Sequence, residues 1–177
     1  MSARQGAYSL YELLVTLGLF ALVLTLGLPS FGNMAASHRV RVEIDKLFHA
    51  VHLARKESVV RRRVVTICPT RDAITCEPTL DWSSGWMMFV NDDRSNAATR
   101  DAGEPLLRHS RPEKWVRISA NRQSFALRAT ELRATNGTIV FCDPAGRIAP
   151  RALVISYTGR PRVADKDSRG RPYRCAH

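Results

Sequence analysis

The feature that most restricts the fold of this chain is an apolar run near its N-terminus, over residues 13–31. Two threonines, two glycines, a proline and a serine are its only interruptions. In a helix these residues would extend about 28 Å, close to the hydrocarbon thickness of a bilayer. We therefore expect a transmembrane helix over residues 8–32.

Three interpretations of this run compete. A signal peptide would need a small-residue cleavage site after the run, and Met34-Ala35-Ala36 fits that requirement poorly. A plain membrane anchor explains the apolar length but not Glu12 at its start, because a carboxylate at the edge of a membrane span is costly without a partner. The third interpretation depends on the residues around Glu12.

These residues follow a short leader and read Gly6-Ala7-Tyr8-Ser9-Leu10-Tyr11-Glu12-Leu13-Leu14. The stretch resembles the type III signal of type IV prepilins, in which an aromatic residue opens the mature chain and a glutamate takes its fifth position. The resemblance implies a leader over residues 1–7, cleavage between Ala7 and Tyr8, and N-methylation of Tyr8. The family usually has glycine before the cut, and this chain has Ala7 there.

The resemblance also implies a role for Glu12 in filament assembly. In the family this glutamate neutralises the amino terminus of a neighbouring subunit, and opposite charges in hydrocarbon are far better paired than alone. A carboxylate solvated at the membrane interface is the alternative. The implied partners are prepilin peptidase, the bacterial inner membrane and other major and minor pilins, with the head in the periplasm.

Beyond the apolar run, the pattern predicts an α+β fold. Apolar residues recur at helical spacing over residues 33–62, so we expect an amphipathic helix that packs one stripe on a sheet. That stripe consists of Val40, Ile44, Leu47, Val51 and Ala54. Residues 63–177 contain short β-branched or aromatic runs between turn residues, which predicts an antiparallel sheet or small sandwich. The expected strands are 64–67, 86–90, 116–119, 124–128, 138–141 and 152–157.

The head contains four cysteines, and none of them forms a C-x-x-C pair or lies at a zinc-like spacing from a histidine. An even number after an export-type segment suggests disulfides in an oxidising compartment. Three pairings are possible, and four reduced, buried thiols are the alternative. We favour Cys68–Cys76, which closes a short loop, and Cys142–Cys175, which pins the C-terminal tail to the core.

Four segments of the head narrow the resemblance. They are Leu53-Ala54-Arg55-Lys56-Glu57-Ser58, Val65-Thr66-Ile67-Cys68-Pro69, Asp81-Trp82-Ser83-Ser84-Gly85-Trp86 and Phe141-Cys142-Asp143-Pro144. Their order is similar to that in the GspH/FimT group of minor pilins and type II secretion minor pseudopilins. Over nearly the whole chain, this resemblance implies a type IV pilin fold without catalytic activity.

The chain is strongly basic, with a formal net charge of +11, which favours an anionic partner. Gly159-Arg160-Pro161-Arg162 is similar to the G-R-x-R motif of FimT-like pilins that bind DNA in natural transformation. Guanidinium groups match phosphate oxygens bidentately. The residues expected to contact DNA are Arg151, Arg160, Arg162, Lys166, Arg169, Arg171 and Arg174.

Other functions find less support in the sequence. The basic residues could instead form a solvated surface or an interface for acidic neighbouring pilins. No groove-reading helix is recognisable, so any DNA binding is expected to be independent of sequence. The acidic stretch 91–104 lacks the ligand spacing of a calcium loop, and no nucleophile is placed convincingly beside a histidine. We predict no metal, no cofactor and no enzyme activity.

The processing signal makes a prediction that mass spectrometry of the filament protein can check. We expect a chain that begins at an N-methylated Tyr8, because only this cut puts Glu12 at the fifth position. A protein that still begins at Met1 or Ser2 would contradict the prediction.

Overall fold

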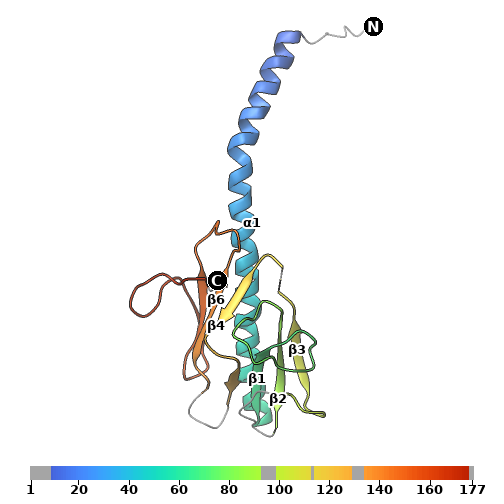
Figure 1. Cartoon of the computed structure of the whole chain (residues 1–177), viewed down its shortest axis with the longest axis vertical. Coiled ribbons are helices and arrows are strands. Elements are labelled where there is room, and N and C mark those ends of the chain that lie inside the picture. Colours follow the sequence, from blue (N-terminus) through green and yellow to red (C-terminus); the bar gives the residue numbers. More distant parts are fainter. Residues whose placement is uncertain (1–8, 93–98, 113, 129–133, 176–177) are drawn as a thin grey trace. The chain divides into compact units, whose positions relative to one another are not determined.

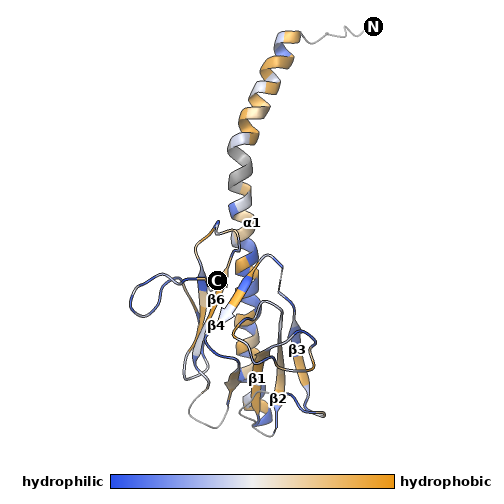
Figure 2. Cartoon of the chain, viewed as in Figure 1, coloured by the Kyte–Doolittle hydropathy of each residue, from blue (hydrophilic) through white to orange (hydrophobic). Residues whose placement is uncertain are grey.

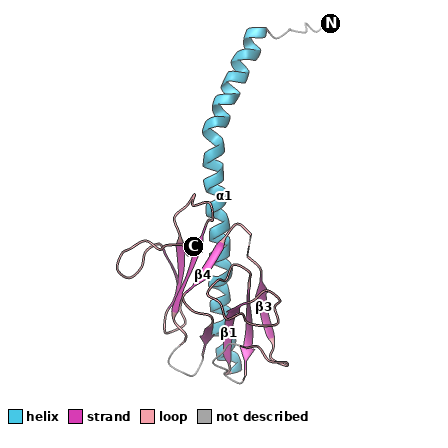
Figure 3. Cartoon of the chain, viewed as in Figure 1, coloured by secondary structure: helices cyan, strands magenta, loops and turns pink. Residues whose placement is uncertain are grey.

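The computed structural model of the chain describes residues 9–92, 99–112, 114–128 and 134–175, without the side chains of residues 26–30. One helix, α1 (Leu10–Arg61), is followed by a series of short strands (Figures 1 and 3). The chain divides into two compact units, residues 1–35 and residues 36–177. We call the second unit the head.

In the first unit, α1 begins with a capped turn. The Ser9 hydroxyl accepts a hydrogen bond from the backbone N–H of Glu12 at 3.2 Å, and the Glu12 carboxylate lies in the first turn, where the helix dipole favours negative charge. The following turns carry exposed apolar side chains (Figure 2). No helix in the described part of the chain is both long and apolar enough to cross a membrane. Ala7 and Tyr8 lie outside the described residues, so the processing site stays a prediction.

The head contains two four-stranded antiparallel sheets. The first has the order β3-β2-β1-β5 and the second the order β4-β6-β7-β8. The strands of the first are β1 (Val64–Pro69), β2 (Trp86–Asn91), β3 (Leu106–Ser110) and β5 (Phe125–Leu127). Those of the second are β4 (Arg117–Ala120), β6 (Gly137–Cys142), β7 (Arg151–Ile155) and β8 (Pro161–Ala164).

The head-resident part of α1 supplies the centre of the core. The five residues of the predicted stripe, Val40, Ile44, Leu47, Val51 and Ala54, are at most 2% exposed. They share one apolar cluster with side chains of both sheets, among them Ile67, Phe125, Phe141 and Leu153. The predicted amphipathic helix packed on an antiparallel β-rich head is therefore confirmed.

The first sheet is buried on both faces at its centre. Every residue of β1 and β2 is buried, and Cys68, Met87 and Phe89 form a second apolar cluster, against which Cys76 packs. The Cys68–Cys76 disulfide closes the loop beside this cluster. Burial on both faces explains why the two strands are almost continuously apolar in sequence.

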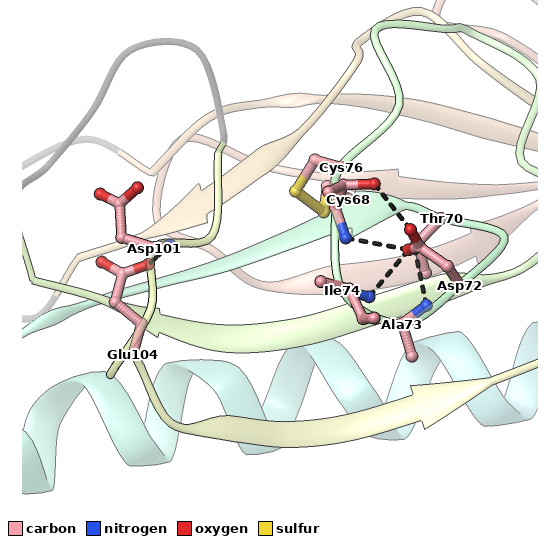
Figure 4. Close-up of a disulfide and its surroundings, with 9 residues drawn as sticks. Cys68, Thr70, Asp72, Ala73, Ile74, Cys76, Asp101 and Glu104 are labelled. Atoms are coloured by element: carbon pink, nitrogen blue, oxygen red, sulfur yellow. Dashed lines mark hydrogen bonds between the residues drawn. A yellow bond between two sulfur atoms is a disulfide. The ribbon is translucent and has the colours of Figure 1, made fainter.

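A single carboxylate organises the disulfide loop (Figure 4). Asp72 accepts hydrogen bonds from the backbone N–H groups of Ile74 and Thr75, at 2.8 and 2.9 Å, and from the hydroxyls of Thr70 and Thr75, each at 3.0 Å. The backbone bonds stabilise the charged form and hold the pKa of Asp72 far below its ordinary value. The loop thus has its own internal polar scaffold.

Two strands were not expected from the sequence, and both lie at sheet edges. β3 contains no β-branched residue, and β8 begins with Pro161. Proline is tolerated at the first residue of an edge strand, because its missing N–H leaves no interior ladder bond unmade. Pairing with β2 and β7 therefore creates strands that local propensity does not indicate.

The turn that joins β7 to β8 requires glycine at position 159. Gly159 has φ +69°, and a Cβ there would lie 2.9 Å from Leu127 Cδ1 and 3.4 Å from the Ala134 Cβ. The Gly159 N–H bonds to the Ser156 carbonyl at 2.9 Å, and the Arg160 carbonyl accepts the Ser156 N–H at 3.1 Å. The first residue of the Gly159–Arg162 motif is thus explained by packing inside the head.

We expect Gly159→Ala to lower the free energy of unfolding by about 1 kcal/mol more than Gly146→Ala. The two glycines share a left-handed backbone, with φ of +69° and +66°, but a Cβ at Gly146 would have no atom within 4 Å. Urea denaturation of both variants measures the difference, which isolates the contact with the buried Leu127 side chain. Equal losses in the two variants would contradict the packing role.

Candidate nucleic-acid interface

Arg162 projects from the face of the second sheet that is turned away from the core. Leu153 and Ile155 point into the core, so the alternation of β7 directs Val154 to the other face. Arg162 is paired with Val154 in register and points the same way. We call this the outer face of the second sheet.

Arg160 and Arg162 are exposed on either side of the buried Pro161. The backbone N–H of Arg160 donates to the Ser156 hydroxyl at 3.2 Å, which holds the end of the turn. Within the described part of the chain, neither arginine has a carboxylate within 4.0 Å. The turn and the β8 ladder therefore present two guanidinium groups that have no counter-charge among the described carboxylates.

The segment after β8 folds into a small basic loop organised by Asp167. This carboxylate accepts the backbone N–H groups of Arg169 and Arg171, at 2.8 and 2.9 Å, and the Arg171 guanidinium at 2.9 Å. These bonds, led by the Arg171 backbone, lower the pKa of Asp167. A surface hollow of about 610 Å³ lies along the loop, lined by Asp167, Arg171, Pro172, Tyr173 and Arg174.

The Cys142–Cys175 disulfide ties this loop to the outer face of the second sheet. Ile139 and Phe141 belong to the core, so Cys142 points to the same face as Arg162. The structure contains both disulfides that the sequence analysis favoured, Cys68–Cys76 and Cys142–Cys175. The disulfide and β8 together hold both ends of the loop.

The seven cations expected to contact DNA fall into two groups. Arg151 forms an ion pair with Asp165 at 2.8 Å, and Arg171 pairs with Asp167 at 2.9 Å. The remaining five are exposed and have no ion pair with any described carboxylate: Arg160, Arg162, Lys166, Arg169 and Arg174. Their contact with DNA stays a prediction, but two of the seven charges are already partly neutralised.

Arg55 of α1 also approaches the β7–β8 turn, which sequence reasoning missed. Its Cδ lies 3.8 Å from the position that a Cβ on Gly159 would occupy, and the residue is exposed. It is separated from Gly159 by 104 positions, so no local pattern could have linked the two. Arg55 is therefore a further exposed cation close to the Gly159 turn.

A second basic and aromatic hollow lies elsewhere on the head, with a volume of about 540 Å³. The Arg39 guanidinium carbon lies 5.9 Å from the centre of the Trp115 ring. Asp143 binds Arg147 with two side-chain contacts, at 2.7 and 2.9 Å, and accepts its backbone N–H at 3.0 Å. The Arg147 guanidinium lowers the pKa of Asp143 to about 2.

The acidic and histidine residues that the structure describes are not gathered into a metal-binding group. No group of three or more His, Cys, Asp or Glu side chains among them could hold a metal ion. Glu104 of the acidic stretch instead braces its own loop. Its carboxylate accepts the backbone N–H of Asp101 at 3.0 Å (Figure 4) and the backbone N–H of Asp92 at 2.7 Å. Residues 93–98 of that stretch lie outside the described chain.

Solved structures with a similar fold include a minor pilin and a minor pseudopilin. Two crystal structures of the type IV minor pilin FimU of Pseudomonas aeruginosa are 22% and 21% identical to this chain, with TM-scores of 0.50 and 0.53. They cover 70% and 72% of this chain and 91% and 90% of FimU. The minor pseudopilin EpsH of the Vibrio cholerae type 2 secretion system is 6% identical, with a TM-score of 0.51, covering 71% of this chain and 96% of EpsH. No curated protein sequence matches significantly.

The long helix and two antiparallel sheets are thus the type IV pilin fold, which pilins and pseudopilins share. The profile of the family described as type II transport protein GspH matches residues 43–159. The chain therefore belongs to the GspH family. The motif Gly159–Arg162 begins where this match ends, so most of the basic segment lies beyond it.

The Asp143–Arg147 pair makes the stability of the head depend on pH. The pKa of Asp143 is lower in the folded chain than in the unfolded chain, so its contribution is complete above about pH 4 and is lost as the pH falls through 2. Between pH 5 and pH 2 we expect wild type to lose about 1 to 2 kcal/mol more stability than Asp143→Asn. Denaturant midpoints across this range measure the difference, and parallel curves would contradict it.

Proposed function

We propose that this protein is a minor type IV pilin whose basic head binds DNA without sequence preference during uptake in natural transformation. The observation that carries the proposal is the pair Arg160 and Arg162, exposed and without described counter-charges on a rigid turn and edge strand. The turn and the strand fix the backbone from which the two side chains extend, and a planar guanidinium matches phosphate oxygens bidentately.

The spacing of the two arginines suits a phosphate backbone. Residues two apart on a strand are separated by about 6.6 Å, and the phosphates of one DNA strand advance about 3.4 Å each along the helix axis. Arg160 and Arg162 can therefore contact separate phosphates of the same strand. Lys166, Arg169 and Arg174 extend the charge into the disulfide-bound loop.

Assembly into a pilus forms the second part of the proposal. Prepilin peptidase would cut between Ala7 and Tyr8, residues 8–32 would reside in the inner membrane before assembly, and the head would lie in the periplasm. Glu12 would then pair with the amino terminus of a neighbouring pilin. Its place in the first helical turn leaves the carboxylate exposed, as such a contact requires.

A structural role is the second candidate function. The family description and the fold shared with a minor pseudopilin favour a subunit that initiates or supports a type II secretion pseudopilus. In that case the basic surface would meet acidic neighbouring subunits. The presence of glycine at position 159 does not discriminate between the two functions. The close approach of Leu127 requires glycine there whichever function the protein has.

DNA binding can be tested on a soluble fragment, residues 33–177, that contains the whole head. Every buried residue among those described lies at position 36 or later, and both disulfides are within the head, so the head contains its own core. With three to five phosphate contacts, the logarithm of duplex affinity should fall with the logarithm of salt concentration with a slope of roughly −3 to −4.5. Fluorescence anisotropy of a labelled duplex measures this slope.

The double variant Arg160→Gln, Arg162→Gln should reduce the magnitude of that slope by about 2, because two phosphate contacts are lost. A matched control, Arg41→Gln with Arg108→Gln, removes two exposed cations from α1 and β3 and should change the slope little. Equal losses in the two double variants would mean that only net charge matters. Weak binding by wild type would favour the assembly role.

A further inference from the structure

Trp115 differs from the other tryptophans of the head in its exposure. Trp82 and Trp86 are fully buried, whereas 60% of Trp115 is exposed. The next residue, Val116, is buried, so the chain anchors its backbone here while the indole ring stays outside the core. Burial of the indole ring would be favourable, yet the Trp115 ring is not part of the core.

The Trp115 ring lies beside a positive charge. Arg39 reaches it from α1, with the guanidinium carbon 5.9 Å from the ring centre, within the range of a cation–π contact. The two residues are 76 positions apart in sequence, so the tertiary fold creates this pair. Even with Arg39 in place, most of the Trp115 surface remains accessible.

Arg147 adds a second guanidinium to the same hollow. The side chain of Asp143 is only 1% exposed, and its two oxygens bind Nε and Nη2 of Arg147. This arrangement fixes the guanidinium plane and leaves other N–H groups of Arg147 for a ligand. The remaining lining residues, Pro144 and Ala145, are small. The hollow therefore combines a planar aromatic with two cations, of which Arg147 is fixed, and one carboxylate that is already paired.

A ligand that suits these groups has a planar unit for the tryptophan and an anionic unit for the arginines. A nucleotide has both, and about 540 Å³ is within the size range of small-molecule sites. An acidic peptide would satisfy the arginines but has no need of the ring. In duplex DNA the bases are already stacked on one another, so a free base implies a single strand.

The second disulfide connects this hollow to the basic loop. Asp143 follows Cys142, Arg174 precedes Cys175, and the Cα atoms of the two cysteines are 6.0 Å apart. The disulfide therefore links a residue next to Arg174, in the lining of one hollow, to a residue next to Asp143, in the lining of the other. A polymer could contact both, whereas a free nucleotide could not.

We infer that the hollow formed by Arg39, Trp115 and Arg147 is a single-strand DNA site, in which a base stacks on Trp115 and the flanking phosphates bind the two arginines. The choice of DNA as the polymer rests on the proposed function. The site differs from the Arg160 and Arg162 surface, because it requires an unstacked base in addition to phosphate.

Trp115→Leu tests the site directly, since it removes the aromatic face but keeps every charge. The probes are a 12-nucleotide oligo(dT), an abasic 12-mer with the same phosphates, and a duplex, all measured with residues 33–177. Stacking on one aromatic side chain contributes about 5- to 140-fold to affinity. We therefore expect Trp115→Leu to weaken oligo(dT) binding at least fivefold and to leave abasic and duplex binding within twofold of wild type.

Trp115→Phe keeps a stacking surface and should recover most of the oligo(dT) affinity. Quenching of tryptophan fluorescence by oligo(dT) should disappear in both variants, because the other two tryptophans are buried. Unchanged oligo(dT) binding by Trp115→Leu, or an equal loss for oligo(dT) and the abasic strand, would overturn the inference. Duplex binding that depends on Arg160 and Arg162 would still support the proposed function in that case, whereas no binding of any probe would overturn both.

Discussion

Burial of one helical stripe between two sheets is the interaction on which the rest of the head depends. Val40, Leu47 and Ala54 contact a cluster to which both sheets contribute, so helix and sheets cannot form separate cores. Burial of this shared apolar surface is the main source of stability available to a domain of this size. The outer face of the second sheet does not contribute to this core, and Arg162 extends from it into solvent.

The central elements could be predicted from the sequence because their patterns are strong. Helical periodicity identified the stripe of α1, and apolar runs identified β1, β2, β6 and β7. The edge strands β3 and β8 were missed, because their residues have no marked β propensity and form strands only through pairing with a neighbour. The disulfides agree with the favoured pairing, in which Cys68–Cys76 closes a short loop and Cys142–Cys175 ties the C-terminal tail to the core.

The candidate surfaces were predicted less completely, and the reasons are physical. A local motif such as Gly159–Arg162 can be recognised in the sequence. Whether an arginine is paired with a carboxylate depends on the residues that folding brings close to it. Arg151 and Arg171 look like Arg160 in sequence, yet each is bound to an aspartate. The contact of Arg39 with Trp115 joins a helix to a loop far along the chain, and no spacing rule connects them. Net charge therefore indicates an anionic partner without locating the cations that are free to meet it.

The alternation of buried and exposed residues over Gly159–Arg162 has a consequence for how this family can diverge. Gly159 and Pro161 are buried and are required by the turn and by packing, whereas Arg160 and Arg162 extend from the same few residues into solvent. Mutations at the two arginines can reverse the local charge while the buried positions, and with them the fold, remain intact. Closely related subunits can therefore acquire or lose an affinity for polyanions through two codons, without passing through an unstable intermediate.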